Sequence, residues 1–201
     1  MGTYLPGDKI IQALKDLPKG CLFILDEAYS EFAPASSLPK IEITDTRVVR
    51  LRTFSKAYGM AGARVGYAMA EENLIKSFEK IRNHFGMNRS AQKSAFEALS
   101  DNQWLSEMVQ KVAIGRQRIY DIASKNNLKA IPSATNFVAI DCGKDSDFAK
   151  KVLNELISLG IFVRMPFVSP QDRCVRVSVG KKRDLDRFKK ALPTALERAS
   201  K

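Results

Sequence analysis

Apolar positions along the first half of the chain alternate between helical and strand-like patterns. Apolar residues recur at helical spacing in four segments, residues 8–17, 71–81, 90–99 and about 102–124. Residues 21–25 form a continuous apolar run between a turn and two acidic residues, which is typical of a strand covered on both faces. Shorter strands are expected at two further places, residues 47–52 and 65–69. Strands that alternate with helices predict a mainly parallel, layered α/β sheet.

The pattern changes after Asn126 and Asn127, where the long helix is expected to stop. Four strands are predicted beyond this point, at residues 128–131, 136–141, 161–165 and 174–179. Two helices are predicted, at residues 146–158 and 183–199. The order β-β-α-β-β-α predicts a small α+β domain over residues 126–201. Residues 1–125 are then part of a larger domain that includes the long connecting helix.

Composition places the chain among ordinary globular proteins. Of its 201 residues, 45% are hydrophobic and 27% charged, which excludes disordered and collagen-like classes. No apolar run approaches the ~20 residues of a membrane helix, and the N-terminus lacks the features of a signal peptide. The three cysteines include no Cys-x-x-Cys pair, which favours a reducing compartment over a disulfide framework or a zinc ribbon. We therefore expect a cytoplasmic protein with no membrane partner.

The net charge of +11 raises the question of a nucleic-acid partner. The basic C-terminal segment, however, has apolar residues at helical spacing, namely Leu185, Phe188, Leu192 and Leu196. Such a segment is typical of an amphipathic helix with a solvated basic face, so we expect no specific nucleic-acid partner. His84 is the only histidine, and we expect no metal site and no serine hydrolase.

Two segments that directly follow predicted strands carry the candidate chemistry, residues 26–29 and 55–67. Ligands of open α/β sheets bind outside the carboxyl ends of the strands. Lys56 lies among small residues and glycines, so it can approach a flat ligand and, when deprotonated, attack an aldehyde. Asp26 could hold a protonated ring nitrogen, and Arg64 could bind a phosphate with its two-pronged guanidinium. These are the groups that pyridoxal phosphate requires.

Each of these residues also has a simpler explanation when it is taken alone. Asp26 could cap a helix or lie in a solvated turn, and Lys56 could be a surface lysine. The joint pattern favours a shared site, because unrelated turns would not also supply serine, glycines and arginine in register.

The motif Ser55-Lys56-Ala-x-Gly-x-Ala-Gly-x-Arg64-x-Gly66-Tyr67 resembles fold-type I pyridoxal-phosphate-dependent aminotransferases. Asp26 and Tyr29, thirty and twenty-seven residues before the lysine, belong to the same resemblance. Within that group, the chain is most similar to the histidinol-phosphate aminotransferase family. Two C-terminal segments, residues 160–164 and 175–180, also resemble the small-domain strands of that family. The likeness covers essentially the whole chain.

The resemblance implies a role for each matching residue of the cofactor site. Lys56 would form the Schiff base with pyridoxal 5'-phosphate and then shuttle a proton. Asp26 would pair with the pyridinium nitrogen, and Tyr29 would hydrogen-bond the ring oxygen. Ser55 and Arg64 would bind the cofactor phosphate.

The resemblance also implies a substrate site and a reaction. Arg176 would bind the substrate α-carboxylate or the corresponding group, and Arg164 would meet a distal phosphate. Their simpler explanations are an outward-facing strand residue and an ion pair on a sheet edge. The reaction would transfer an amino group between a phosphorylated amino alcohol and 2-oxoglutarate, a 2-oxo acid acceptor, in a homodimer.

Alternatives remain open at this stage. An aromatic or aspartate-type aminotransferase, or a related decarboxylase, would use the same scaffold. The chain resembles roughly the C-terminal 60% of a family member, with the Gly-rich phosphate-binding helix start expected upstream of Met1. A non-catalytic fragment, or a basic surface that binds polyanions, is therefore the third hypothesis.

Overall fold

The computed structural model describes all 201 residues, and their contacts divide the chain into two compact units. The lysine unit comprises residues 4–109, and the C-terminal unit comprises residues 1–3 and 110–201. The division lies within helix α4 (Asn102–Lys125), whereas the sequence suggests a boundary after residue 125. The domain boundary at residue 125 stays a prediction.

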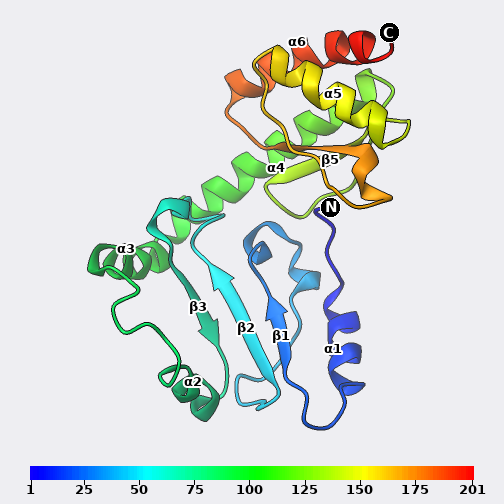
Figure 1. The fold of residues 1–201 in the computed structure, drawn as a ribbon. Coiled ribbons are helices and arrows are strands. Elements are labelled where there is room, and N and C mark those ends of the chain that lie inside the picture. The colour runs from blue at the N-terminus through cyan, green and yellow to red at the C-terminus, as the bar shows by residue number, and fades with distance from the viewer. The chain divides into compact units, whose positions relative to one another are not determined.

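The lysine unit is built on a three-stranded mixed sheet in the order β1-β2-β3 (Figure 1). The strands are β1 (Phe23–Asp26), β2 (Val48–Thr53) and β3 (Gly66–Met69). β1 runs parallel to β2, and β3 runs antiparallel to β2. The helices of this unit are α1 (Gly7–Lys15), α2 (Glu72–Phe78) and α3 (Arg89–Ser100), with short 3-10 turns η1 (Ser30–Phe32), η2 (Ala35–Ser37) and η3 (Ala61–Ala63).

The expectation that the first strand is covered on both faces is wrong for this chain. Exposure alternates along β1, and Ile24 is 63% exposed while Phe23 and Leu25 are half-buried. The apolar run correctly predicts a strand with two apolar sides. Whether both sides are covered depends on segments packed from elsewhere, which a local pattern does not report.

Helix α3 packs against the segment that follows β2. Its first turn is capped by Asn88, whose side chain accepts a hydrogen bond from the backbone N–H of Ala91 at 2.7 Å. Ala91 and Ala95 are buried in one cluster with Phe54 and Val65. The small residues of α3 therefore let the helix lie close to the start of the lysine motif.

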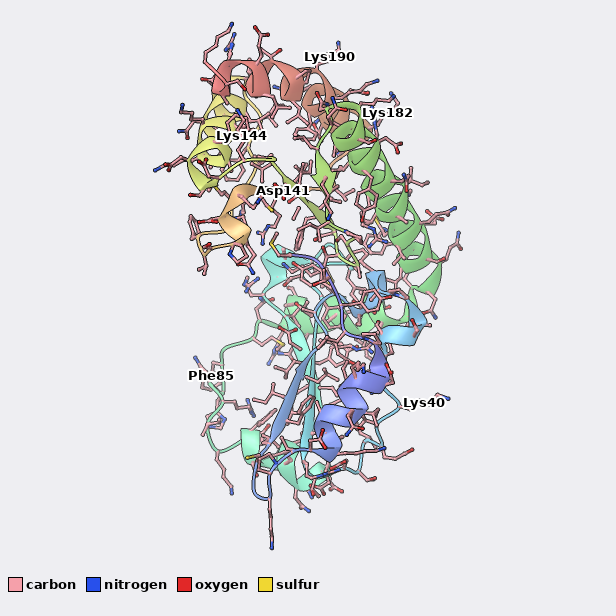
Figure 2. All side chains as sticks on the ribbon, turned by 90° about the vertical axis from the view of Figure 1, so that its right-hand side faces the viewer. Lys40, Phe85, Asp141, Lys144, Lys182 and Lys190 are labelled. Carbon is pink, nitrogen blue, oxygen red and sulfur yellow. The ribbon has the colours of Figure 1, made fainter.

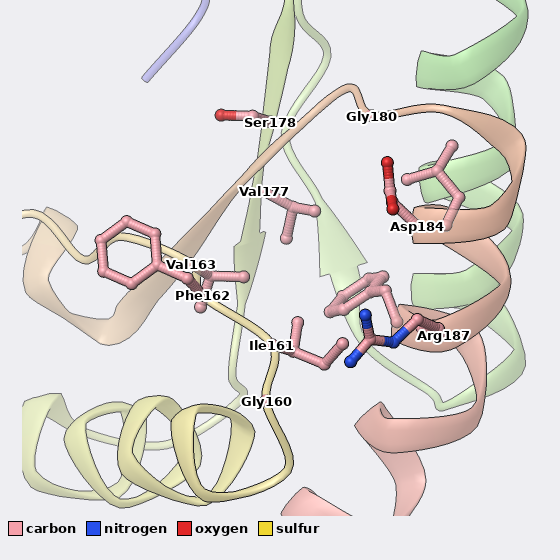
Figure 3. A pocket seen from close by; sticks show the side chains of 11 residues that line it. Gly160, Ile161, Phe162, Val163, Val177, Ser178, Gly180, Asp184 and Arg187 are labelled. Atoms are coloured by element: carbon pink, nitrogen blue, oxygen red, sulfur yellow. The ribbon is translucent and has the colours of Figure 1, made fainter.

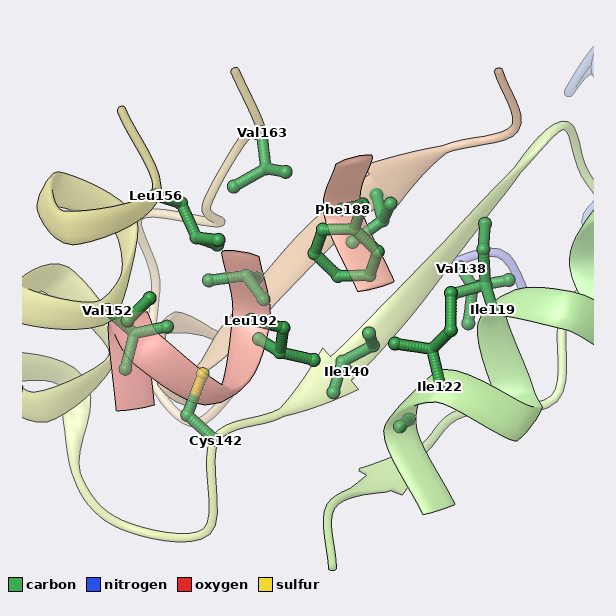
Figure 4. Packing of buried hydrophobic residues seen from close by; sticks show 14 of the residues in the cluster. Ile119, Ile122, Val138, Ile140, Cys142, Val152, Leu156, Val163, Phe188 and Leu192 are labelled. Atoms are coloured by element: carbon green, nitrogen blue, oxygen red, sulfur yellow. The ribbon is translucent and has the colours of Figure 1, made fainter. Parts of the chain in front are cut away.

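The C-terminal unit is a three-stranded antiparallel sheet with helices packed on it. The strands, in spatial order, are β4 (Lys129–Ala130), β5 (Phe137–Asp141) and β6 (Cys174–Ser178), and the helices are α5 (Ser146–Ser158), α6 (Lys182–Ala199) and the second half of α4, with η4 (Gln171–Arg173) before β6. Figure 4 shows the core, in which Ile119, Val138, Val152, Leu156 and Leu192 are completely buried. The predicted amphipathic helix at the C-terminus is α6, which buries Leu185, Phe188 and Leu192.

The strand predicted at residues 161–165 is absent. Only Arg164 pairs with β6, through a single antiparallel bridge to Arg176. Pro166 lacks the N–H that a continuing ladder needs, and Gly160 turns the chain with a φ of 73° just before the segment. Apolar residues alone therefore gave the wrong element here. No helix in the structure combines the length and the apolar character needed to cross a membrane.

Candidate active site

The parallel pairing of β1 and β2 brings two predicted site segments to one edge of the sheet. Asp26 ends β1 and lies opposite Leu51, and the backbone N–H of Glu27 donates to the Leu51 carbonyl at 2.9 Å. One oxygen of the exposed Asp26 carboxylate accepts a hydrogen bond from the Ala28 N–H at 2.9 Å. This local turn fixes the direction of Asp26 at the strand end.

Lys56 lies on a tight turn that is anchored by Phe54. The Phe54 N–H donates to the Val65 carbonyl at 3.2 Å, and the Phe54 carbonyl accepts from the Met60 N–H at 2.9 Å. Gly59 donates to the Lys56 carbonyl at 3.0 Å and has a φ of 69°, a conformation that favours glycine. Because Phe54 is only 2% exposed, the turn that carries Lys56 is held in place by a buried residue.

The turn lies against the chain's only tryptophan. A Cβ atom at Gly59 would be 3.5 Å from the Trp104 ring, so the backbone of the turn approaches the indole closely. Gly66 allows a second close approach, because a Cβ there would be 2.7 Å from the Arg52 carbonyl oxygen. Glycine at position 66 is therefore what lets β3 pair with β2 directly after the lysine turn.

The structure brings Lys56 and Tyr29 together. The Lys56 Nζ lies 5.2 Å from the centroid of the Tyr29 ring, and both side chains are half-buried. An ammonium group at this distance interacts favourably with an aromatic face. The contact joins the two segments that the sequence singled out.

Ser55 and Arg64 flank this pair within the same motif. The Ser55 N–H donates to the Thr53 hydroxyl at 3.1 Å, which tightens the end of β2. Arg64 adopts a left-handed conformation with φ 53°, and its Nη1 donates to the Ala61 carbonyl at 2.9 Å. A non-glycine residue in this region is uncommon and is frequently found at functional sites.

Four charged side chains form a network that the sequence reasoning did not identify. The Glu27 carboxylate accepts two hydrogen bonds from Arg50, at 2.6 and 3.1 Å, and one from Arg52 at 3.0 Å. Arg52 also lies 3.7 Å from a carboxylate oxygen of Glu31. We call these four residues the buried ion network. Its only sequence signal is the Arg-x-Arg pattern of β2, whose two arginines share one face of the strand.

The network changes the pKa of one of its own members, Arg52, and that of the neighbouring Tyr58. Burial lowers the pKa of Arg52, but the hydrogen bond and negative charge of Glu27 outweigh it and the pKa is raised. The pKa of Tyr58 is raised by burial and by the negative charge of Glu31. Arg52 therefore stays charged, and Tyr58 stays neutral to a higher pH than an ordinary tyrosine does.

In the C-terminal unit, Arg164 and Arg176 lie directly opposite each other. Each backbone N–H donates to the other's carbonyl, at 3.1 and 2.6 Å, and residues paired in this way project from one face. The Arg176 guanidinium lies 4.6 Å from the centroid of the Phe137 ring, away from the buried neighbours Val175 and Val177. Neither arginine forms an ion pair with a carboxylate, so the expected alternative for Arg164, an ion pair on a sheet edge, is not observed.

The C-terminal unit also has a pocket of about 170 Å³, whose lining side chains are drawn in Figure 3. Its lining includes Ile161, Val177 and Phe188, with Asp184 and Arg187 from α6. None of the predicted site residues lines this pocket, so it adds nothing to the proposed chemistry.

Comparison with known proteins gives the family. The model of the class I and II aminotransferases matches residues 1–192. This chain belongs to that family. Among relatives of the chain, the histidinol-phosphate aminotransferase of Bacillus licheniformis is 38% identical over 194 residues, covering 95% of the chain and 53% of the relative. That of Carboxydothermus hydrogenoformans, histidinol-phosphate aminotransferase 2, is 37% identical over 201 residues, covering 98% and 54%.

A solved structure extends the likeness to three dimensions. The histidinol-phosphate aminotransferase from Sinorhizobium meliloti, in complex with pyridoxal-5'-phosphate, is 46% identical and superposes with a TM-score of 0.95. The alignment covers 98% of this chain and 54% of that structure. The expected α/β fold of a type I aminotransferase is thereby confirmed. The chain spans about half the length of the relatives it matches.

Proposed function

We propose that the chain carries the lysine-bearing part of a pyridoxal-phosphate-dependent aminotransferase site of the histidinol-phosphate type. The observation that carries the proposal is the Lys56 amine, 5.2 Å from the Tyr29 ring centroid, on the turn beside the end of β1. The amino group would pass between a phosphorylated amino alcohol and a 2-oxo acid such as 2-oxoglutarate.

The chemistry of the donor set fits this cofactor. A primary amine suits its aldehyde, a carboxylate its protonated ring nitrogen and a phenol its ring oxygen, while a hydroxyl and a guanidinium suit its phosphate. Lys56, Asp26, Tyr29, Ser55 and Arg64 supply these five groups in that order. When bound, pyridoxal phosphate supplies an electron sink for negative charge at the substrate α-carbon.

The chain's own residues would then position groups and move protons. Lys56 would take a proton from the substrate α-carbon and deliver it to the cofactor carbon that bears the transferred nitrogen. Asp26 would accept a hydrogen bond from the ring N–H and keep that proton in place, because a nearby carboxylate stabilises the charged form. Tyr29 would donate its hydroxyl to the ring oxygen, and Ser55 and Arg64 would hold the phosphate.

Arg164 and Arg176 are the proposed substrate-binding pair. Two guanidiniums from directly opposed positions, with no carboxylate between them, favour an anionic ligand. We assign Arg176 to the α-carboxylate or its counterpart and Arg164 to the distal phosphate. The homodimer and the cytoplasmic location stay predictions.

The direct test is cofactor binding to the chain as it stands. Wild-type protein mixed with pyridoxal phosphate should develop a visible absorption band that borohydride bleaches. Lys56→Ala should abolish the band, because the amine that bonds to the aldehyde is gone. Lys40→Ala, which removes an exposed lysine of the same unit, is the matched control and should keep it. Identical spectra for wild type and Lys56→Ala would refute the assignment.

A further inference from the structure

We propose that the buried ion network is a positioning device that holds Tyr29 at its distance from Lys56, with Glu31 as its adjustable member. This inference rests on the proposed function of Lys56. It assigns a role to Glu31 and Arg52, neither of which is among the groups that would touch the cofactor.

Each member of the network belongs to a segment that bears a site residue. Glu27 directly follows Asp26, Arg52 precedes Lys56 by four positions, and Glu31 follows Tyr29 by two. The register puts Asp26 opposite Leu51, so Glu27 and Arg52 project from the other face of the sheet. The network therefore links the chain around Asp26 and Tyr29 to the strand that leads to Lys56, on the sheet face opposite Asp26.

The Glu27 part of the network is fully satisfied. Its side chain is only 5% exposed and accepts three hydrogen bonds from the two arginines. Such a carboxylate ties the end of β1 to the middle of β2 with fixed geometry. Removing it would leave two arginines without their acceptor, so it is a poor site for a clean test.

Glu31 is different, because it is buried without hydrogen bonds. Its side chain is 7% exposed, and neither carboxylate oxygen has a hydrogen-bond partner. The only cation at ion-pair distance is Arg52, 3.7 Å away. A buried carboxylate without hydrogen bonds is costly to desolvate. Arg52 keeps its hydrogen bond to Glu27 when Glu31 is replaced by an amide of the same shape, so that change leaves no cation without a partner. Stability alone therefore does not explain a charge at this position.

The place of Glu31 in the fold does explain its charge. Glu31 lies in η1, and Tyr29 is the residue directly before it. The Tyr29 carbonyl accepts a hydrogen bond from the Phe32 N–H at 3.0 Å. Attraction between Glu31 and Arg52 draws η1 toward β2, which leads into the lysine turn. Without the charge on Glu31, η1 and Tyr29 lose this tether while the pairs between Glu27 and the two arginines remain.

The test measures how fast Lys56 captures an aldehyde. The Lys56 amine adds to the aldehyde of pyridoxal phosphate and loses water to give a C=N bond. Borohydride then delivers hydride to the carbon, and solvent supplies the proton to nitrogen. The stable secondary amine is located by peptide mass spectrometry, so the readout is independent of turnover.

Glu31→Gln should slow labelling of Lys56 at least about fivefold, because a small misplacement of reacting groups lowers the reaction rate steeply. Its urea midpoint should equal or exceed that of wild type. Glu31→Asp, which keeps the charge, should recover part of the rate. Glu79→Gln is the matched control: it removes the partner of Arg82 on the exposed surface and should label at the wild-type rate.

The outcomes separate the two proposals. Equal labelling of wild type and Glu31→Gln at Lys56 overturns the positioning role but leaves the proposed function intact. A lower urea midpoint in Glu31→Gln also overturns it, since Glu31 would then be a structural residue. Absence of any wild-type label at Lys56 refutes the proposed function, and the positioning role with it.

Discussion

Gly66 marks the tightest backbone approach beside the proposed site. An added Cβ would lie 2.7 Å from the backbone carbonyl oxygen of Arg52, and neither strand can yield without breaking its pairing. Gly66→Ala should therefore destabilise the protein by about 2 kcal/mol, in the range of other overpacked sites. Urea unfolding measures this, with Gly62→Ala, where nothing lies within 4 Å, as the control. Equal midpoints for the two variants would contradict the prediction.

Tyr58 gives the stability a dependence on alkaline pH. Its pKa is raised in the folded state by burial and by Glu31, so its contribution is complete below the ordinary value of about 10. As pH rises through the folded pKa, that contribution is lost, because the unfolded chain releases the proton more easily. Tyr58→Phe should lose less stability than wild type between neutral and strongly alkaline pH. Urea midpoints measured across that range test this, and Tyr4→Phe, at an exposed tyrosine, should parallel the wild type.

At the scale of elements, α3 couples a helix cap to the lysine turn. Asn88 satisfies the Ala91 N–H, and Ala91 packs in the cluster that holds Phe54. Asn88→Ala should cost about 1 kcal/mol, the usual value for a lost N-cap. Circular dichroism during urea unfolding reports it. Asn102→Ala, at an exposed asparagine in the first turn of α4, should be close to neutral, and a similar loss in both variants would count against the cap.

Helical periodicity predicted the elements well because it is a local property. The predicted bounds of α3, α5 and α6 differ from those observed by at most one residue at each end. The strand expected at residues 161–165 failed because pairing depends on a partner, and only Arg164 meets one. The prediction that β1 is covered on both faces failed for the same reason. The sequence around Ile24 does not report whether another segment packs against this side chain.

The residues of the proposed site also differ in whether the local sequence could identify them. Spacing and residue type were enough to select Lys56 and Tyr29, which the structure brings together. The buried ion network could not be found this way, because Glu27 and Arg52 become neighbours only once the register of β1 and β2 is known. No sequence pattern marks Glu31, because this residue stands out only through the burial of its side chain in the folded structure.

At the scale of the whole molecule, charge is distributed very unevenly. The C-terminal unit has 19 basic and 9 acidic residues, a net charge of +10 out of the total +11. Lys182 and Lys190 of α6 and Lys144 are among the basic side chains visible in Figure 2. The lysine unit is nearly neutral, with 14 basic and 13 acidic residues.

Retention on an anionic resin should follow this asymmetry. The double variant Lys189→Gln/Lys190→Gln should elute at clearly lower salt, because it weakens the basic unit where the field is concentrated. The control Lys9→Gln/Lys15→Gln removes the same charge from the lysine unit and should shift elution less. Equal shifts would show that only total charge matters, and would weaken the case for the polyanion-binding alternative.

Trp104 gives the lysine turn a built-in optical reporter. Its indole is the chain's sole tryptophan and lies beside Gly59, three positions after Lys56. Intrinsic fluorescence of the unlabelled protein therefore originates next to the place where the aldehyde is expected to dock. A chromophore captured there would quench this emission by energy transfer, so a single cuvette could follow loading in real time without any engineered dye.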